Sequence, residues 1–504
     1  MKRREFIKST SALAALSAVR PARSADTERL SMPELIDARA GGRFRLQARR
    51  AVHQFGSGLS GETMGFSADY LGPVIRVGPG ETEAVIDNGI DETITTHWHG
   101  LLIPGEVDGG PHQPIPPGKT WRAVLPITQE PATTWYHSHV HGDTGRQVYR
   151  GLAGILQISD GRDDERGLPA SYGEDDLTLI VQDKRFERGQ LVYEPFMPDI
   201  MHGFLGNMIM VNGQVGRQAV LPPGIVRLRL LNASNARILQ FSLASGRPMH
   251  LIATDSGMLP NPLELSSVRL ATGERAEILI DLARVQDDTL IAHTVANSPM
   301  MGGMMGGRAS PAVRGQAITV LPMVVDASRK ARQSRLPVDL GGSTPPTDTG
   351  DAQRDEFTLE MGMMGGMGRG MMGRGGMGPG MGRGMMGGGM RHGMSDGFAI
   401  NGRSFDMARI DRHIERGRLQ LWRVNTNMMH HPFHVHGVRF AVLSVDGQAP
   451  RPEQSGWKDT VLVSGETELL MRFEHAASAR FPYMLHCHIL EHEDAGMMAQ
   501  FSVA

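Results

Sequence analysis

The chain is poor in several features that would point to other classes of protein. It has one cysteine in 504 residues, which excludes a disulfide framework. Its formal net charge is only −2, so neither nucleic acid nor a charged membrane surface is indicated as a partner. Beyond a mild apolar run at residues 12–19, no stretch approaches the length of a membrane span. We expect a monomer without a membrane span.

The N-terminus is typical of an exported protein. The twin arginine Arg3-Arg4 is followed by Phe6, Ile7 and Lys8, and the apolar run comes next. This order is that of a twin-arginine signal, and residues 22–24 offer a small-residue cleavage site. A basic amphipathic N-terminus is the alternative. We predict a signal peptide at residues 1–24 and a periplasmic or otherwise exported product.

Short apolar runs separated by glycine and proline dominate the rest of the chain. Residues 74–77 and 225–230 are plain examples, and such runs predict strands of β-sandwiches. The length suggests about three domains. We expect an all-β fold of three consecutive sandwiches at residues 25–160, 170–325 and 352–504, with a polar linker at 326–351.

An internal repeat relates the first and last of these domains. His137-Ser138-His139 and His486-Cys487-His488 are each followed by an Ala-Gly pair and an apolar run. Ser138 therefore stands where Cys487 stands in the last domain. The middle domain has only unpaired histidines, His202, His250 and His293, and we interpret it as structural.

Histidines in H-x-H pairs are far more frequent than chance predicts. With 20 histidines, roughly one such pair would arise by chance, and in a strand both members would lie on one face. Strand-spaced pairs of imidazoles are what a metal cluster requires, whereas isolated buried histidines would show no such spacing. The chain contains His97/His99, His137/His139, His139/His141, His434/His436 and His486/His488.

The segment around Cys487 predicts a second kind of metal site. A lone thiolate beside several imidazoles, with Met497 ten residues on, supplies the Cys, His and weak axial Met of a blue-copper centre, and His431 is the obvious donor of the second histidine. In a strand, Cys487 faces one way while His486 and His488 face the other. One tripeptide could thus ligate two separate centres and connect them covalently.

These motifs, in this order, resemble the four copper motifs of the multicopper oxidases, and the resemblance covers nearly the whole chain. It implies three cupredoxin-like sandwiches and four copper ions. By motif, the type 1 copper takes His431, Cys487, His492 and the axial Met497. The type 2 copper takes His97 and His434. One type 3 copper takes His99, His137 and His488, and the other takes His139, His436 and His486. The family motif does not use His141.

The resemblance also implies the chemistry. One-electron oxidation of a donor would be coupled through Cys487 to four-electron reduction of O₂ to water. That reduction needs protons, and Asp108 and Glu493 match acids near the copper sites of related oxidases. General acid/base work requires a carboxylate close to bound oxygen. The alternative for each is a surface or turn carboxylate.

Residues 361–394 are almost entirely methionine, glycine and arginine, without a strand or helix period. Thioethers are soft ligands that select Cu(I). Residues 300–305 repeat the theme. The insert could therefore gather a cuprous substrate, or be a low-complexity spacer.

Within the family, the insert, the export signal and the residues around Met497 resemble bacterial periplasmic cuprous oxidases, which detoxify Cu(I). Met361 and Met429 match two features of their substrate site. Asn427 stands where those enzymes have an aspartate, and Gly366 lies about where their second acid would be. Two alternatives stay open: a laccase acting on phenols and aromatic amines, and a copper-sequestering protein without turnover.

Overall fold

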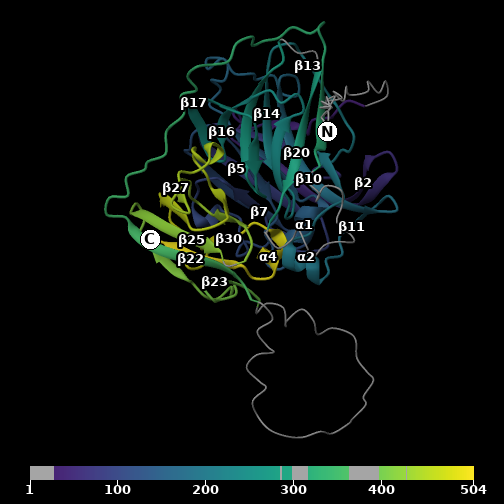
Figure 1. Ribbon diagram of the computed structural model, residues 1–504. Coiled ribbons are helices and arrows are strands. Elements are labelled where there is room, and N and C mark those ends of the chain that lie inside the picture. The colour runs from purple at the N-terminus through teal and green to yellow at the C-terminus, as the bar shows by residue number, and fades with distance from the viewer. Residues whose placement is uncertain (1–27, 284–286, 298–315, 363–396, 427) are drawn as a thin grey trace, which may run out of the picture.

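The computed structural model describes residues 28–283, 287–297, 316–362, 397–426 and 428–504. Strands account for most of its regular structure, and they form three sandwiches in chain order (Figure 1). The expected all-β fold of three consecutive sandwiches is therefore confirmed. No helix of the described residues combines the length and apolar character of a membrane span. The expected signal peptide lies outside the described residues.

The first domain pairs two sheets around its own apolar core. Strand β2 (Arg43–Gly56) covers this core with one face: Phe44, Leu46 and Ala48 are buried, while the residues between them are exposed. One sheet has the order β1 (Leu35–Asp37), β4 (Val74–Val77), β9 (Ala153–Ile158), β8 (Ala132–His137) and β6 (His97–His99). The other has β3 (Leu59–Phe66), β2 (Arg43–Gly56), β5 (Gly80–Asn88) and β7 (Thr120–Ile127). Two short helices complete the domain, η1 (Gly105–Val107) and α1 (Thr144–Arg150).

The middle domain has the same two-sheet design. Its first sheet contains β17 (Gly257–Leu265), β16 (Met249–Thr254), β19 (Arg275–Asp281), β14 (Ile225–Asn232), β10 (Asp176–Glu187) and β12 (Met208–Val211). Its second contains β13 (Ala219–Leu221), β21 (Ile318–Val325), β20 (Asp287–Val295), β15 (Ile238–Leu243) and β18 (Val268–Leu270). Strand β11 (Gln190–Val192) pairs with both β10 and β3, so one sheet runs from the first domain into the middle one. Helix α2 (Met197–His202) follows β11.

The third domain carries two five-stranded sheets. The outer sheet has the order β23 (Phe398–Ile400), β22 (Gln353–Met361), β25 (Leu419–Thr426), β29 (Thr467–Arg472) and β27 (Phe440–Val445). The other has β24 (Arg412–Ile414), β31 (Met498–Val503), β30 (Tyr483–Cys487), β26 (His431–Val435) and β28 (Thr460–Val463). Its short helices are η4 (Pro452–Gln454) and α4 (Leu490–Asp494). Figure 1 shows α1, α2 and α4 together at the junction of the three domains.

Residues 326–352 form no helix or strand and run along the outside of the molecule (Figure 1). The segment is nevertheless anchored. Leu340 is buried in the core of the middle domain. Farther on, the Ser343 hydroxyl donates to Glu130 of the first domain and accepts from the indole of Trp457 in the third. The connection therefore touches all three domains.

Candidate copper centres

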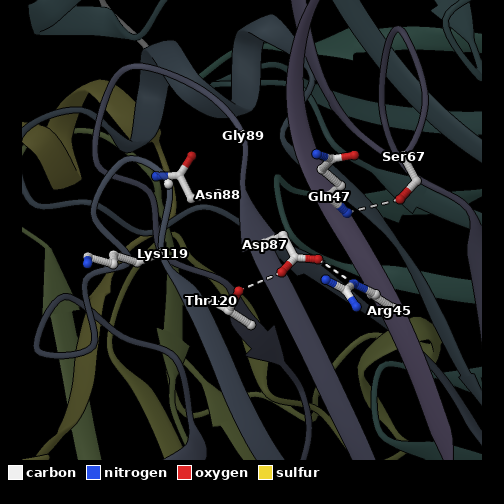
Figure 2. A pocket seen from close by; sticks show the side chains of 9 residues that line it. Arg45, Gln47, Ser67, Asp87, Asn88, Gly89, Lys119 and Thr120 are labelled. Carbon is white, nitrogen blue, oxygen red and sulfur yellow. Dashed lines mark hydrogen bonds and ion pairs between the residues drawn. The ribbon is translucent and has the colours of Figure 1, made fainter.

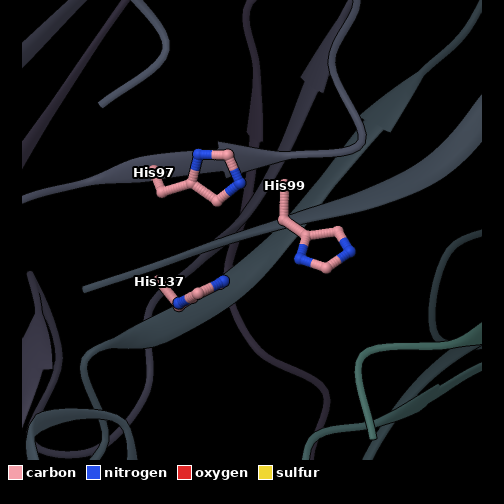
Figure 3. A group of neighbouring side chains, drawn as sticks. All are labelled: His97, His99 and His137. Carbon is pink, nitrogen blue, oxygen red and sulfur yellow. The ribbon is translucent and has the colours of Figure 1, made fainter. Parts of the chain in front are cut away.

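Four strands bring the histidine pairs together, two from the first domain and two from the third. In the first domain, β6 and β8 run antiparallel, with His97 opposite His137. In the third, β26 and β30 run antiparallel, with His434 opposite His486. Figure 3 shows His97, His99 and His137, whose ring centroids lie 5.5–5.8 Å apart. The two halves meet at the domain interface, where His97 stacks on His436 and His99 on His434.

Eight buried histidines form one continuous cluster there: His97, His99, His137, His139, His434, His436, His486 and His488. Three of them converge on one point, because His486 Nε2 lies 3.3 Å from His139 Nε2 and 3.2 Å from His436 Nε2. Three nitrogens bound to one ion at about 2.0 Å in tetrahedral directions lie about 3.3 Å apart. The spacing fits a metal ion between these three rings.

The other rings also present free nitrogens inward. His97, His137 and His434 each hold Nδ1 against a backbone carbonyl, at 2.8–3.0 Å, so that nitrogen carries the proton. Their Nε2 atoms are buried and have no hydrogen-bond partner among the described residues. Unpartnered buried nitrogens of this kind are rare unless a ligand completes them. A carbonyl behind each ring is also the usual way in which a metal-binding histidine is oriented.

His99 is turned the other way round. Its Nε2 lies 3.0 Å from Asp459 Oδ1 and 3.1 Å from Thr460 Oγ1, while its Nδ1 has no partner. The carboxylate therefore fixes the tautomer, and His99 presents Nδ1 to the cluster.

Burial disfavours the charged form of six of the eight histidines. It lowers the pKa of each of these rings well below the usual value for histidine, and neighbouring histidines lower the pKa further: His99, His137, His139, His434, His436 and His488. A neutral imidazole keeps one lone pair for a metal, so the electrostatics match the geometry.

A second group of ligands lies around Cys487. His431 Nδ1 is 3.3 Å from the Cys487 sulfur and 3.3 Å from His492 Nδ1, and His492 Nδ1 is 3.7 Å from the sulfur. All three side chains are fully buried. Burial raises the pKa of the Cys487 thiol well above its usual range, so a thiolate at this position needs a cation beside it. The donor set and its spacing fit a copper ion of the blue type.

Met497 lies next to Cys487. Its backbone carbonyl accepts a hydrogen bond from Cys487 N at 3.1 Å, and its side chain is buried in the apolar core that also contains Cys487. This core provides the low-polarity surroundings expected of a weak axial thioether ligand.

Two carboxylates contact Nδ1 atoms of histidines in the cluster. Asp108 Oδ2 lies 2.7 Å from His436 Nδ1, while Asp108 Oδ1 is buried without a partner. Glu493, from α4, lies 3.2 Å from His139 Nδ1 and 3.3 Å from His486 Nδ1. Both acids therefore contact histidines of the cluster rather than the Cys487 group.

Similar sequences support the interpretation of these two groups of side chains as copper sites. Two multicopper oxidase family models match residues 48–163 and 384–504. The chain is 35% identical to the cell division protein FtsP of Sodalis glossinidius, covering all of this chain and 98% of that protein. It is 32% identical to the multicopper oxidase mco of Staphylococcus aureus, covering 94% of this chain and 92% of that one.

The chain belongs to the multicopper oxidase family.

Solved structures extend the likeness to the fold. The laccase-like multicopper oxidase CueO from Ochrobactrum sp. superposes with a TM-score of 0.81 at 36% identity, covering 94% of this chain and all of that one. The McoA multicopper oxidase of Aquifex aeolicus gives 0.78 at 29% identity, covering 95% and 99%. The three sandwiches of this multicopper oxidase are therefore cupredoxin-like, as expected.

The methionines expected to bind substrate lie close to the Cys487 group but inside the protein. Met361 ends β22, and Met429 precedes β26; both are buried in the core shared with Cys487. Asn427, Gly366, and almost all of the methionine-rich insert lie outside the described residues, as does the 300–305 segment. His141 is exposed and packs edge-on against Phe405.

Sequence reasoning missed a buried ionic network beside the cluster. The Arg275 guanidinium of the middle domain binds both oxygens of Asp459, at 2.7 and 2.5 Å. Lys458 pairs with Asp255 and Glu274, at 2.9 Å each. Burial alone would raise the pKa of Asp459, but Arg275 holds it below its usual range. The Lys458-Asp459 dipeptide was visible in the sequence, whereas its middle-domain partners lie roughly 185–205 residues away and give no local signal.

One surface pocket is separate from the histidine cluster, and another adjoins it. One of about 680 Å³, lined by Arg45, Asp87 and Thr120 among others, lies on the first domain and contains no histidine, cysteine or methionine (Figure 2). Arg45 and Asp87 form an ion pair in it, and because its lining has none of the proposed ligand types, it is not part of the metal sites. Another, of about 410 Å³, includes Gln129 and Gly437, and it adjoins the cluster because Gly437 follows His436.

Proposed function

We propose that this multicopper oxidase couples the one-electron oxidation of Cu(I) to the four-electron reduction of O₂ to water, in copper detoxification outside the cytoplasm. The observation that carries the proposal is the complete donor set. Two groups of buried side chains are built as metal sites, and they share the tripeptide His486-Cys487-His488. A protein that merely stored copper would need no such connection.

The assignment of ligands follows the motifs. His431, Cys487, His492 and Met497 hold the type 1 copper. His97 and His434 hold the type 2 copper. The two type 3 coppers take His99, His137 and His488, and His139, His436 and His486. The convergence of His139, His436 and His486 supports the grouping of the last set, and the other five rings each keep a nitrogen open for a metal among the described residues.

When bound, the copper ions supply electron transfer and O₂ reduction; the chain supplies their surroundings. Cys487 connects the two groups through the peptide backbone of β30. Asp108 and Glu493 orient histidines of the cluster, and we propose that they also carry the protons that O₂ reduction consumes. Asp108 Oδ1 is suited to this because none of the described residues forms a hydrogen bond with it.

The methionine content of the chain supports Cu(I) as the substrate. The chain has 33 methionines, and the methionine-rich insert continues β22, which ends beside the Cys487 core. Soft thioethers favour Cu(I) over harder donors. The export signal expected at residues 1–24 places the protein where extracytoplasmic copper would be met.

A laccase is the second candidate, and one comparison favours it. The Ochrobactrum enzyme is described as having oxidase activity towards lignin model compounds. Relatives named cell division protein FtsP raise a third possibility, a role without turnover.

One experiment separates the three. Copper-loaded protein is tested for blue absorption and for O₂ uptake with Cu(I) or a phenol as sole reductant, in the full chain and in a variant lacking residues 364–394. We expect blue colour, Cu(I)-driven uptake, and a selective loss of that uptake in the deletion variant. If the deletion left both the Cu(I)-driven and the phenol-driven O₂ uptake unchanged, a laccase would be favoured. Colourless, inactive protein after copper loading would contradict an oxidase.

A further inference from the structure

The middle domain covers the outward edge of the Cys487 group. His492 uses Nδ1 towards Cys487 and His431, which leaves Nε2 pointing away from them. That Nε2 lies 3.3 Å from the backbone carbonyl of Met201 in α2. Because Nδ1 faces the metal-binding group, Nε2 carries the proton and donates to this carbonyl. The outer edge of His492 is therefore closed by a helix of another domain.

The contact with α2 is held from both sides. Asp199 within α2 pairs with Arg185 of β10 at 2.7 Å. Just after the helix, Phe204 N donates to the buried Glu491 carboxylate at 2.9 Å, one residue before His492. Between them, Gly203 has φ +82°, and a Cβ there would lie 2.9 Å from Ile489. These contacts hold residues 197–204 against residues 489–492, which follow Cys487.

Three residues of α2 carry side-chain donors suited to Cu(I). Met197 and Met201 are four apart and so lie on one helical face. Met197 is 39% exposed, whereas Met201 is partly buried against the core that contains Cys487. His202 is partly buried, and its Nδ1 is buried without a hydrogen-bond partner in the part of the chain that the structure describes. Two thioethers and an open imidazole nitrogen form a set that favours Cu(I).

We propose that Met197, Met201 and His202 form an entry site for cuprous ions on the middle domain. The inference rests on the proposed oxidase function and names where its substrate is oxidised. Met197 receives Cu(I) at the surface, and Met201 with His202 holds it beside His492. Each Cu(I) loses one electron, which leaves through the Met201 carbonyl and His492, and the ion departs as Cu(II). Four such events, with O₂ and four protons, yield two water molecules.

This position differs from Met361 and Met429, which are buried in the third domain. It also explains why a domain without paired histidines carries a helix against the Cys487 loop. An exposed Phe196 at the start of α2 would favour an aromatic donor instead, and the test separates the two.

The test compares full-length Met197→Leu/Met201→Leu and His202→Gln with a matched control, Met32→Leu. Leucine keeps the volume and apolar character of methionine but removes the sulfur. Met32 lies away from α2, with its sulfur 3.9 Å from Asn212. We measure O₂ uptake with Cu(I) and with a phenol, and we locate Ag(I), a redox-inert substitute for Cu(I), by anomalous scattering in soaked crystals.

We expect the KM for Cu(I) to rise about tenfold in the α2 variants, with kcat within about twofold and phenol oxidation unchanged. Ag(I) should bind between Met201 and His202 in the parent protein and not in the variants, while Met32→Leu matches the parent in both assays. An unchanged KM, a parallel loss of phenol oxidation, or Ag(I) absent from α2 in the parent would overturn the entry site. Failure of the oxidase itself is recognised separately, because the parent would then lack Cu(I)-driven O₂ uptake while Ag(I) still reports on α2.

Discussion

Arg275 joins all three domains at a single fully buried point. Its guanidinium binds the Asp459 carboxylate of the third domain, the Thr133 carbonyl of the first at 3.1 Å, and the Asp255 carbonyl of its own domain at 2.8 Å. Asp459 in turn orients His99. Substitution Arg275→Met keeps a long side chain with an aliphatic stem but removes the guanidinium, which leaves the Asp459 charge without its partner.

The expected cost follows from that unpaired charge. Removing one member of a buried ion pair lowers the free energy of unfolding by about 3–5 kcal/mol. For a sandwich of this size, each kcal/mol corresponds to roughly 2–4 °C, so the melting temperature should fall by roughly 6–20 °C. Loss of the His99 support should also weaken copper binding by the cluster about 10–100-fold.

Calorimetry of copper-depleted protein measures the melting temperature and the free energy of unfolding without the contribution of bound metal. Competition with a chelator measures copper affinity. Adding Asp459→Asn to Arg275→Met should restore part of the lost stability, because the amide carries no charge to be compensated. Arg162→Met is the control: its pair with Glu165 is well exposed, and we expect a change within about 0.5 kcal/mol. A loss for Arg275→Met no larger than that of the control would refute the reasoning.

Three further predictions concern other buried groups. Burial lowers the pKa of Lys184 to about 7, so its ammonium is disfavoured by folding; Lys184→Met should raise stability near neutral pH by up to about 5 kcal/mol. Because the unfolded chain binds more protons between that pKa and the ordinary value, melting curves should show the gain shrinking towards pH ~10, and a gain independent of pH would contradict this origin. Cys487→Ser should remove the blue absorption and one copper ion per chain and abolish oxidation of both Cu(I) and phenols, so a persisting blue band would sink the ligand assignment. Glu493→Gln should keep the blue absorption while slowing O₂ reduction by about 10²–10⁴-fold, and full activity would exclude the proposed proton role.

Much of the fold and of the candidate site could be predicted from the sequence because the signals are local. Alternation of buried and exposed residues marks β2, and the H-x-H spacing marks strands whose histidines share a face. The convergence of His139, His436 and His486 follows the expected set. Glu493 directly follows His492, an expected type 1 ligand, in the sequence, yet its carboxylate reaches the histidine cluster, since successive residues of α4 point in different directions.

Other features required the folded chain. The nitrogen that each histidine presents depends on what lies behind its ring: carbonyls for His97 and His434, but Asp459 for His99. The sequence also gave no sign that the middle domain contributes α2 to His492, or Arg275 to Asp459.

The sequence by itself determined which residues are candidate ligands and in what order they occur, because strand parity and residue chemistry act within a few residues along the chain. Only the tertiary structure decided which groups orient those ligands and what covers them. Those contacts join residues up to several hundred positions apart, and their strength comes from complete burial, which exists only once the three domains have packed together.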